Sequence, residues 1–247
     1  MKRSHLLLAG AAIGAVGYAA LVRPRHLRWG STWRERGRIW AGDEFMPEPL
    51  TQSTRVITIH APAERVWPWI AQIGQDRGGF YSYTSLENLV GAEMKNADDI
   101  HPEWQHRNVG EKVWLGTPSK FDGKAYMIVA RWISGRSMVL VAPPDWDRIS
   151  DGKPAINMVW SFLVEPLSPE SCRLIARSLG GPAQTTSGKL ANYMFWEPAH
   201  FIMERGMMLG IKSRVEAREQ ACLPVRIFKT AVEFAEAARK SRSMTGR

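Results

Sequence analysis

The feature of this sequence that most restricts its fold is a change in the period of its apolar residues. Between Val109 and Ser178, β-branched and apolar residues recur with period two, as in strands that bury one face. From Tyr193 to Gln220, apolar residues recur at helical spacing over a long stretch. A run of strands followed by one long helix indicates an α+β fold in which the helix packs on the sheet.

Five strands are predicted within the period-two block, separated by segments rich in Gly, Pro, Asp and Ser. The strands are Glu111–Leu115, Ala125–Ile133, Ser137–Ala142, Ile156–Glu165 and Cys172–Leu179. The turn segments are Gly116–Gly123, Ser134–Arg136, Pro143–Lys153 and Pro166–Ser171. Because the connections are short, we expect successive strands to pair as an antiparallel meander.

Further elements are predicted on both sides of this block. They are a strand over Thr54–His60, a helix over Glu64–Ile73 that Pro68 should kink, a short helix over Thr84–Val90 and an amphipathic helix over Val225–Ala238. This order predicts a helix-grip fold, with a curved antiparallel sheet of about six or seven strands around the Tyr193–Gln220 helix. A cavity is expected between the sheet and the helix.

The net charge of +9 is concentrated at the two ends of the chain. Residues 1–50 contain 8 Lys and Arg against 4 Asp and Glu, and residues 212–247 contain 9 against 4. Residues 51–211 contain 16 of each sign. Nucleic-acid binding needs a basic surface on the folded domain, so no nucleic-acid partner is predicted. Basic ends beside an apolar segment favour an anionic membrane surface instead.

The apolar segment is Leu6–Val22, which has 17 residues and no charge. A helix of that length rises about 25 Å, slightly less than the ~30 Å hydrocarbon core of a bilayer. A cleaved signal peptide and a buried helix are the alternatives, but Tyr18-Ala19-Ala20 matches a cleavage site only loosely. We therefore predict an N-terminal membrane anchor. The arginines that follow it favour a cytoplasmic body, with the protein at the membrane through a single span.

Four segments follow from these patterns. They are the anchor (1–22), a basic connector that bears tryptophans (23–53), a helix-grip domain (54–220) and a C-terminal helix and tail (221–247). The connector contains Trp29, Trp33 and Trp40. Two interpretations of these rings stay open, since they could lie at the membrane interface or pack on the domain.

Several stretches resemble the SRPBCC superfamily, the helix-grip proteins that include START domains, birch-pollen-allergen-like proteins and polyketide cyclase/dehydrase-like proteins. The resemblance rests on Ile59–Ile70, Gly79–Tyr83, Ile100–Gln105 with Val109–Glu111, Trp160–Leu163 and Phe201–Lys212. It covers most of residues 54–212 and points to a bacterial subgroup more than to the allergen branch, so that with the predicted anchor the chain would be a bacterial membrane-anchored member. The anchor and the helix after Pro224 depart from the pattern. The resemblance implies an apolar or amphipathic ligand in the sheet–helix cavity, and in some members cyclisation, dehydration or hydrolysis there.

The start of the long helix carries the candidate acid–base residues. Glu197, His200 and Glu204 have the spacing i, i+3, i+7, which places them on one helical face. His200 paired with a carboxylate has the chemistry of a general acid or base. The catalytic candidates are therefore His200, Glu204 and Tyr81. The alternative is that these residues only form salt bridges or cap the helix beside Arg177 or Arg205.

No metal or other cofactor is predicted. The Glu-x-x-His spacing also occurs in di-iron sites, but those need a second such motif from a facing helix, and this sequence has none. Cys172 and Cys222 have no metal-ligand spacing. The sequence also lacks a Gly-rich phosphate loop and a Gly-x-Ser-x-Gly motif, which argues against nucleotide hydrolysis and serine hydrolase chemistry.

Aromatic side chains with a few polar groups are the candidate lining of the cavity. The predicted ligand-binding residues are Phe80, Tyr83, Asn88, Trp132, Trp160, Arg177, Trp196, Met203 and Met207. The alternative is that the rings and methionines are ordinary core. The leading hypothesis is a membrane-tethered binding or carrier domain for a hydrophobic small molecule that resembles a lipid or polyketide. The second is a lyase or isomerase of the cyclase/dehydrase type. A collapsed cavity in a domain that only bridges proteins is a third.

Overall fold

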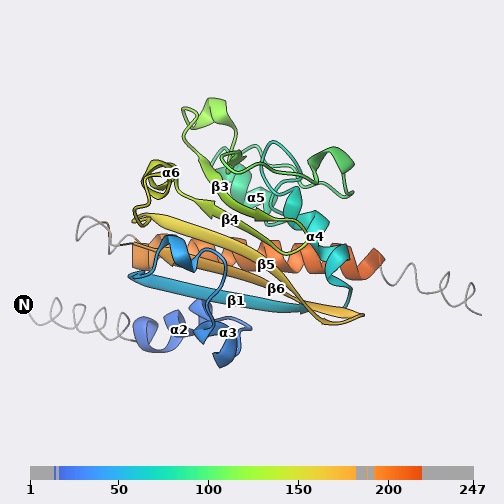
Figure 1. The fold of residues 1–247 in the computed structure, drawn as a ribbon, viewed down its shortest axis with the longest axis horizontal. Coiled ribbons are helices and arrows are strands. Elements are labelled where there is room, and N and C mark those ends of the chain that lie inside the picture. Colours follow the sequence, from blue (N-terminus) through green and yellow to red (C-terminus); the bar gives the residue numbers. More distant parts are fainter. Residues whose placement is uncertain (1–13, 15–16, 182–187, 189–191, 219–247) are drawn as a thin grey trace, which may run out of the picture.

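The structure, a computed structural model, describes residues 14, 17–181, 188 and 192–218. Its centre is a curved six-stranded antiparallel sheet packed on one long helix, which lies behind the sheet in Figure 1. The strands are β1 (Thr51–Ile59), β2 (Lys112–Trp114), β3 (Tyr126–Ile133), β4 (Ser137–Val141), β5 (Met158–Ser168) and β6 (Ser171–Gly180). The described part of the helix covers 197–218, after a π-helical turn, η5 (Asn192–Trp196). The predicted α+β class, antiparallel curved sheet and C-terminal helix are confirmed.

The sheet has the strand order β1-β6-β5-β4-β3-β2. Strands β2 to β6 therefore form the predicted meander, and β1 joins it at β6, with Val56 opposite Ile175. The ladder is irregular in β3 between Val129 and Arg131, and in β5 between Pro166 and Ser168. The second irregularity lets β5 continue past Pro166, where the sequence predicted a turn.

Alternate residues of each strand point to opposite faces of the sheet. The inner face, which the long helix covers, contributes Ile59, Phe162 and Leu174 to the main hydrophobic core. The outer face buries Val56 and Ile175 under Trp40. Because Arg55 lies two residues from Ile57 on β1, it belongs to the inner face, where its side chain is buried.

Helices α4 (Ala63–Ala71), with Pro68 inside it, and α5 (Thr84–Leu89) lie where the sequence predicted helices. A third, α6 (Pro143–Ser150), occupies a segment that was predicted as a turn, so that prediction was wrong. The two prolines stand at its start, where a missing N–H costs nothing. The buried carboxylate of Asp145 accepts hydrogen bonds from the backbone N–H groups of residues 156–158, which fixes α6 to the start of β5. Two short 3-10 turns, η3 (Pro102–Trp104) and η4 (Pro118–Lys120), lie between β1 and β3.

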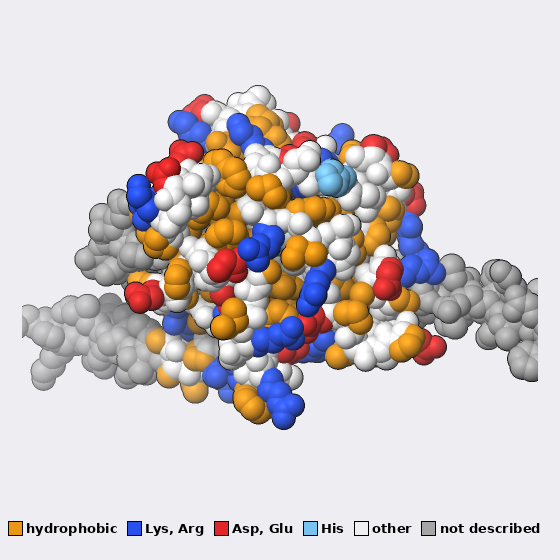
Figure 2. Space-filling view, viewed as in Figure 1, with side chains coloured by type: hydrophobic (Ala, Val, Ile, Leu, Met, Phe, Trp, Pro, Cys, Tyr) orange, Lys and Arg blue, Asp and Glu red, His pale blue; other side chains and the backbone are white. Residues whose placement is uncertain are grey.

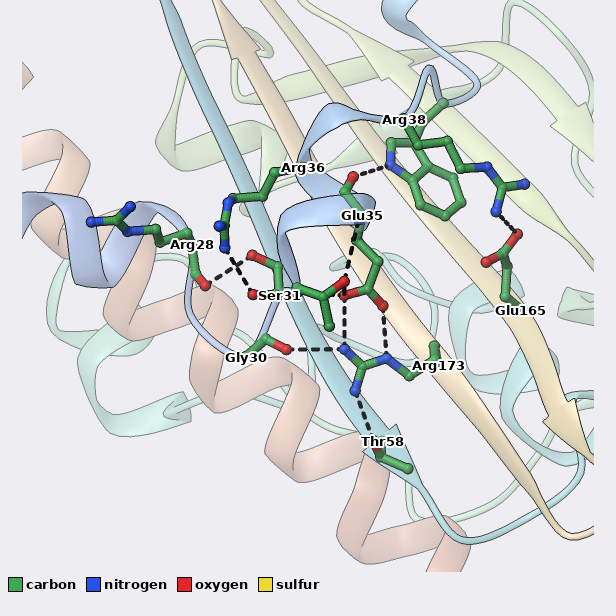
Figure 3. Close-up of polar contacts among 11 residues, drawn as sticks. Arg28, Gly30, Ser31, Glu35, Arg36, Arg38, Thr58, Glu165 and Arg173 are labelled. Atoms are coloured by element: carbon green, nitrogen blue, oxygen red, sulfur yellow. Dashed lines mark hydrogen bonds and ion pairs between the residues drawn. The ribbon is translucent and has the colours of Figure 1, made fainter.

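The N-terminal segment packs on the sheet through η1 (Tyr18–Val22), α2 (Arg23–Leu27), α3 (Trp33–Gly37) and η2 (Asp43–Phe45). Figure 3 shows the contacts that hold residues 28–40 there. Arg173 donates to both carboxylate oxygens of Glu35, at 2.8 and 3.0 Å, and to Thr58 and the Gly30 carbonyl. Of the three connector tryptophans, Trp40 is buried, Trp29 packs against the core and Trp33 is exposed.

Two glycines allow close backbone approaches in this arrangement. Gly30 has φ of +68°, and a side chain there would meet the carbonyl of Val56. The Val56 N–H donates to the Trp29 carbonyl at 2.9 Å, so the connector runs directly beside β1. A side chain at Gly210 would meet the carbonyl of Tyr81, which brings that loop onto the long helix.

Some predictions fall on parts of the chain that the structure does not describe. The Val225–Ala238 helix and Cys222 lie outside the described residues, as does most of Leu6–Val22. Within the described residues, no helix combines the length and the apolar character that a bilayer crossing requires. On the face of the molecule in Figure 2, basic and acidic side chains are interspersed.

Candidate functional site

A cleft of about 660 Å³ lies between the sheet and the first turns of the long helix. The ends of β1, β5 and β6 form one wall, and the helix forms the other with Trp196, Glu197 and His200. Leu27 from α2 also lines it. The apolar side chains of the lining include Leu115, Met127, Ile156, Met158 and Trp160, beside the polar side chains of Thr51, Gln52, Asn157 and Asn192. A cleft of this size and lining suits a small molecule with a large apolar body.

A buried ion pair stands at the inner end of this cleft. The Arg55 guanidinium donates to Glu204 Oε2 at 2.6 Å, and the Trp160 indole N–H donates to Glu204 Oε1 at 2.7 Å. Both charged side chains are almost completely buried. Burial alone would raise the pKa of Glu204, but Arg55 and these hydrogen bonds lower it below its usual value. Glu204 is therefore a carboxylate with its charge balanced at neutral pH.

His200 lies one helical turn before Glu204 and faces the cleft. Its Nε2 atom is 3.6 Å from Glu204 Oε1, too far for a hydrogen bond, and its ring meets Trp160 edge to face at 5.3 Å. That nitrogen is buried and has no hydrogen-bond partner among the described residues. Burial lowers the pKa of His200, so the imidazole is neutral at pH 7. The Nε2 atom thus faces Glu204, and the exposed part of the neutral ring is what a molecule in the cleft would meet.

The N-terminal segment is joined to the same site by polar contacts. Arg23 binds both carboxylate oxygens of Glu197, at 2.7 and 3.0 Å. The Arg55 Nε–H donates to the carbonyl of His26 at 2.8 Å. The buried imidazole of His26 also has its pKa lowered by burial. Arg23 and Arg55 are thus each paired with a glutamate. Because His26 and His200 are neutral, the net charge of these six side chains is zero.

Sequence reasoning missed Arg55, Arg23 and His26. Arg55 could have been found, because it is a charged residue on the apolar face of a strand, with Ile57 and Ile59 at the alternate positions. Such a residue needs a buried partner. The spacing does not reveal which carboxylate that is, since Arg55 and Glu204 are 149 residues apart.

The structure brings His200 and Glu204 together but places Tyr81 elsewhere. The Tyr81 hydroxyl accepts a hydrogen bond from Gln72 at 2.8 Å, and burial raises its pKa. Its backbone packs on the helix at Gly210, which is ten residues, or about 15 Å, beyond His200. Tyr81 therefore stands away from the cleft.

The predicted ligand-binding residues occupy three kinds of place. Trp160 and Trp196 line the cleft. Phe80 and Met207 lie in the main core, where Phe80 stacks on Trp160 at 6.1 Å. Trp132 packs against this core next to Trp67, and the backbone carbonyl of Met203 accepts a hydrogen bond from Ser82. Tyr83, Asn88 and Arg177 lie apart from it.

The contacts of this last group show what the side chains do. Asn88 exchanges hydrogen bonds with the backbone of Met94. Arg177 binds Asp43 on the outer face of the sheet, because it occupies an outward position on β6. Across the described part of the chain, no three His, Cys, Asp or Glu side chains are grouped to hold a metal ion.

Comparison with known proteins gives structural likeness alone. No family model matches the chain, and no curated protein matches it. A hypothetical protein from Helicobacter pylori is 10% identical, with a TM-score of 0.40 over 71% of this chain and 94% of its own. A protein from Nitrosospira multiformis is 12% identical, with a TM-score of 0.39 over 68% and 99%. A polyketide-cyclase-like protein from Corynebacterium glutamicum is 17% identical, with a TM-score of 0.31 over 74% and 96%. This chain thus contains residues that have no counterpart in these structures.

Proposed function

We propose that the protein binds an amphipathic small molecule in the cleft beside His200, and that Leu6–Val22 holds it at a membrane. The observation that supports the binding role most directly is the cleft itself, about 660 Å³ in volume, with the partly exposed imidazole of His200 in its wall. Apolar side chains such as Met127, Met158 and Trp160 suit the body of such a ligand, and the neutral imidazole is a polar neighbour for its polar group.

The charge of the site selects the polar group of the ligand. Arg55 with Glu204 and Arg23 with Glu197 are already neutral pairs. A ligand carboxylate would be desolvated in the cleft without an unpaired cation to balance it, because Arg55 and Arg23 are each already bound to a glutamate. A hydroxyl or carbonyl group avoids that cost. The ligand class is therefore an apolar molecule with an uncharged polar group, such as a long-chain alcohol or a polyketide-like ketone.

Membrane tethering fits a ligand of this class. A molecule with a large apolar body partitions into a bilayer, so a tethered cleft stands next to its supply. The apolar Leu6–Val22 segment and the arginines after it are the sequence features that support the tether.

Binding can be tested with fluorescent probes on the full chain in detergent. We expect a pyrene-labelled fatty alcohol to bind saturably and more tightly than the corresponding fatty acid. His200→Phe should weaken alcohol binding about fivefold to tenfold, because one hydrogen bond is worth about 1 kcal/mol or slightly more. His101→Phe is the matched control, since His101 lies in a loop outside the cleft. Absence of saturable binding, or equal loss in both variants, contradicts the proposal.

The second candidate is a lyase or isomerase that uses His200 as its base. One arrangement favours it: Arg55 and Trp160 fix the Glu204 carboxylate beside an imidazole that is neutral and faces the cleft. Incubating the chain with a β-hydroxy ketone and following loss of water would test this role. A conversion that survives His200→Ala unchanged excludes His200 as the base.

A further inference from the structure

Four large apolar side chains stand exposed where the N-terminal segment meets the long helix. They are Leu21 and Val22 at the end of η1, and Phe195 and Trp196 at the end of η5. We call these four residues the apolar collar. Phe195 and Trp196 are each more than 60% exposed although their rings pack on each other at 5.1 Å. Neighbouring exposed apolar side chains of this size are candidates for a surface that meets a partner or a membrane.

The two halves of the collar are held side by side. The Tyr18 hydroxyl donates to the carbonyl of Tyr193 at 3.2 Å, and the Arg23 guanidinium lies 4.7 Å from the centre of the Tyr193 ring. The Arg23–Glu197 ion pair closes the same contact one turn further on. These contacts join the two segments that carry the collar residues, which lie about 174 residues apart in the sequence.

The collar borders the mouth of the cleft and continues the apolar run of the N-terminus. Trp196 belongs both to the collar and to the cleft wall, and Leu27 in the next helix lines the cleft as well. Residues Leu6–Val22 end in the collar, and the exposed Arg25 and Arg28 follow it directly. Tryptophan beside arginine is the composition of a membrane–water interface, and arginines near the surface are attracted to anionic lipids.

We propose that the apolar collar, with Arg25 and Arg28, seats the mouth of the cleft on an anionic bilayer. This inference rests on the proposed function, in that the ligand then passes between bilayer and cleft without crossing water. The occupant is a lipid surface because the collar is continuous with the Leu6–Val22 segment and is followed by exposed positive charge.

Depth measurements on the full chain test this orientation. Phe195→Cys is spin-labelled in a Cys222→Ser background, while Cys172 stays unlabelled because burial raises the pKa of its thiol to about 12. The chain is reconstituted in vesicles of phosphatidylcholine with phosphatidylserine. Leu167→Cys is the matched control, because Leu167 is 60% exposed, as Phe195 is at 62%, and lies in the β5–β6 hairpin at the other end of the sheet (Figure 1).

We expect the label at position 195 to be accessible to oxygen and protected from a water-soluble nickel complex. The label at position 167 should show the opposite. In wild type, vesicles that contain phosphatidylserine should protect the label at position 195 from the nickel complex better than vesicles of phosphatidylcholine alone. The double substitution Arg25→Glu and Arg28→Glu should abolish this difference. Val22→Cys gives a second position on the collar should Phe195→Cys fail to fold.

Three results overturn the proposal. The first is equal access of the nickel complex to both labels, and the second is failure of the chain to stay with the vesicles. The third is protection of the label at position 195 that persists in detergent when the protein has the mass of a dimer, because a second copy of the chain would then cover the collar. Failure of the binding function is distinguishable, because the labels report depth whether or not the pyrene alcohol binds the same preparation.

Discussion

Glu204 accepts hydrogen bonds from two residues on different strands, Arg55 on β1 and Trp160 on β5. The carboxylate therefore connects the long helix to both strands at the inner end of the cleft. A buried ion pair adds little net stability compared with apolar residues of the same shape, but loss of one partner leaves an uncompensated charge. The pair consequently makes the cleft sensitive to single substitutions.

Arg55→Met is expected to lower the free energy of unfolding by about 3–5 kcal/mol, because it leaves the Glu204 carboxylate buried and unpaired. Urea denaturation of the purified chain measures the loss. Arg38→Met, which breaks the partly exposed pair with Glu165 and a contact with the Trp40 ring, should cost only about 1 kcal/mol. Adding Glu204→Leu to Arg55→Met should recover part of the loss. Equal effects of the two arginine substitutions would contradict the buried pair.

His200 makes stability depend on pH. Its folded-state pKa is lowered by burial, so below about pH 6.5 the unfolded chain binds a proton that the folded chain does not. Stability is thus complete above that pH and is lost as the pH falls, by up to about 1.4 kcal/mol per pH unit for this group. His200→Gln should flatten the dependence between pH 7 and 5, as followed by urea titration. Met127→Leu, a cleft change without a titrating group, serves as control, and parallel curves for wild type and His200→Gln would contradict the assignment.

Among the helices and strands, α5 carries an unusual acid. Burial raises the pKa of Glu87 to about 7, and its Oε2 atom has no hydrogen-bond partner among the described residues. The folded chain therefore holds a proton that the unfolded chain releases near pH 4.5, so stability falls as the pH rises from about 4.5 to about 7.

Glu87→Gln should remove this loss. Because the side chain is only partly buried, we expect a gain of about 1 kcal/mol at pH 8 and none at pH 4. Thermal melts at the two pH values measure the difference. Glu170→Gln, an exposed change in the β5–β6 turn, is the control. A gain that is the same at both pH values would indicate a packing effect instead.

The sequence predicted most helices and strands correctly, because the residue patterns that specify them are local. Period two located the five meander strands, and Gly and Pro located most turns. The segment of α6 was misjudged because two prolines and an aspartate resemble a turn, whereas here the prolines begin a helix and Asp145 binds the amides of a neighbouring strand.

The candidate site was less predictable. His200 and Glu204 came from one helix, where spacing is sufficient to place them together. Arg177 was proposed for the cavity, but the β1–β6 register places it on the outer face with Asp43. Contacts such as Arg23 with Glu197 depend on the tertiary fold, which no local pattern encodes.

For the molecule as a whole, the Arg23–Glu197 ion pair joins the segment before the sheet to the helix after it. These two side chains are partly shielded from water, so the pair should contribute more than a fully exposed one. A double-mutant cycle with Arg23→Gln and Glu197→Gln should give a coupling free energy of about 1 kcal/mol in urea denaturation.

The reference for this cycle is Lys124 with Asp122, which lie 3.9 Å apart and are both more than 80% exposed. Lys124→Gln and Asp122→Asn should give coupling near zero. A coupling for the Arg23 pair that is no larger than this reference would mean that the ion pair does not help to join these two segments, which then depend on their other contacts, such as that of Tyr18 with Tyr193.

The hydrogen bond from the Val56 N–H to the carbonyl of Trp29 limits where the protein can be truncated. Strand β1 is the last strand on its side of the sheet, and residues 29 and 30 occupy its otherwise free edge. Unprotected edge strands recruit other chains and aggregate. A fragment that starts at residue 54 would lose this cover and expose unpaired amides at the edge of β1. The useful boundary for truncation lies before Arg23, which also keeps the His26 carbonyl that Arg55 binds.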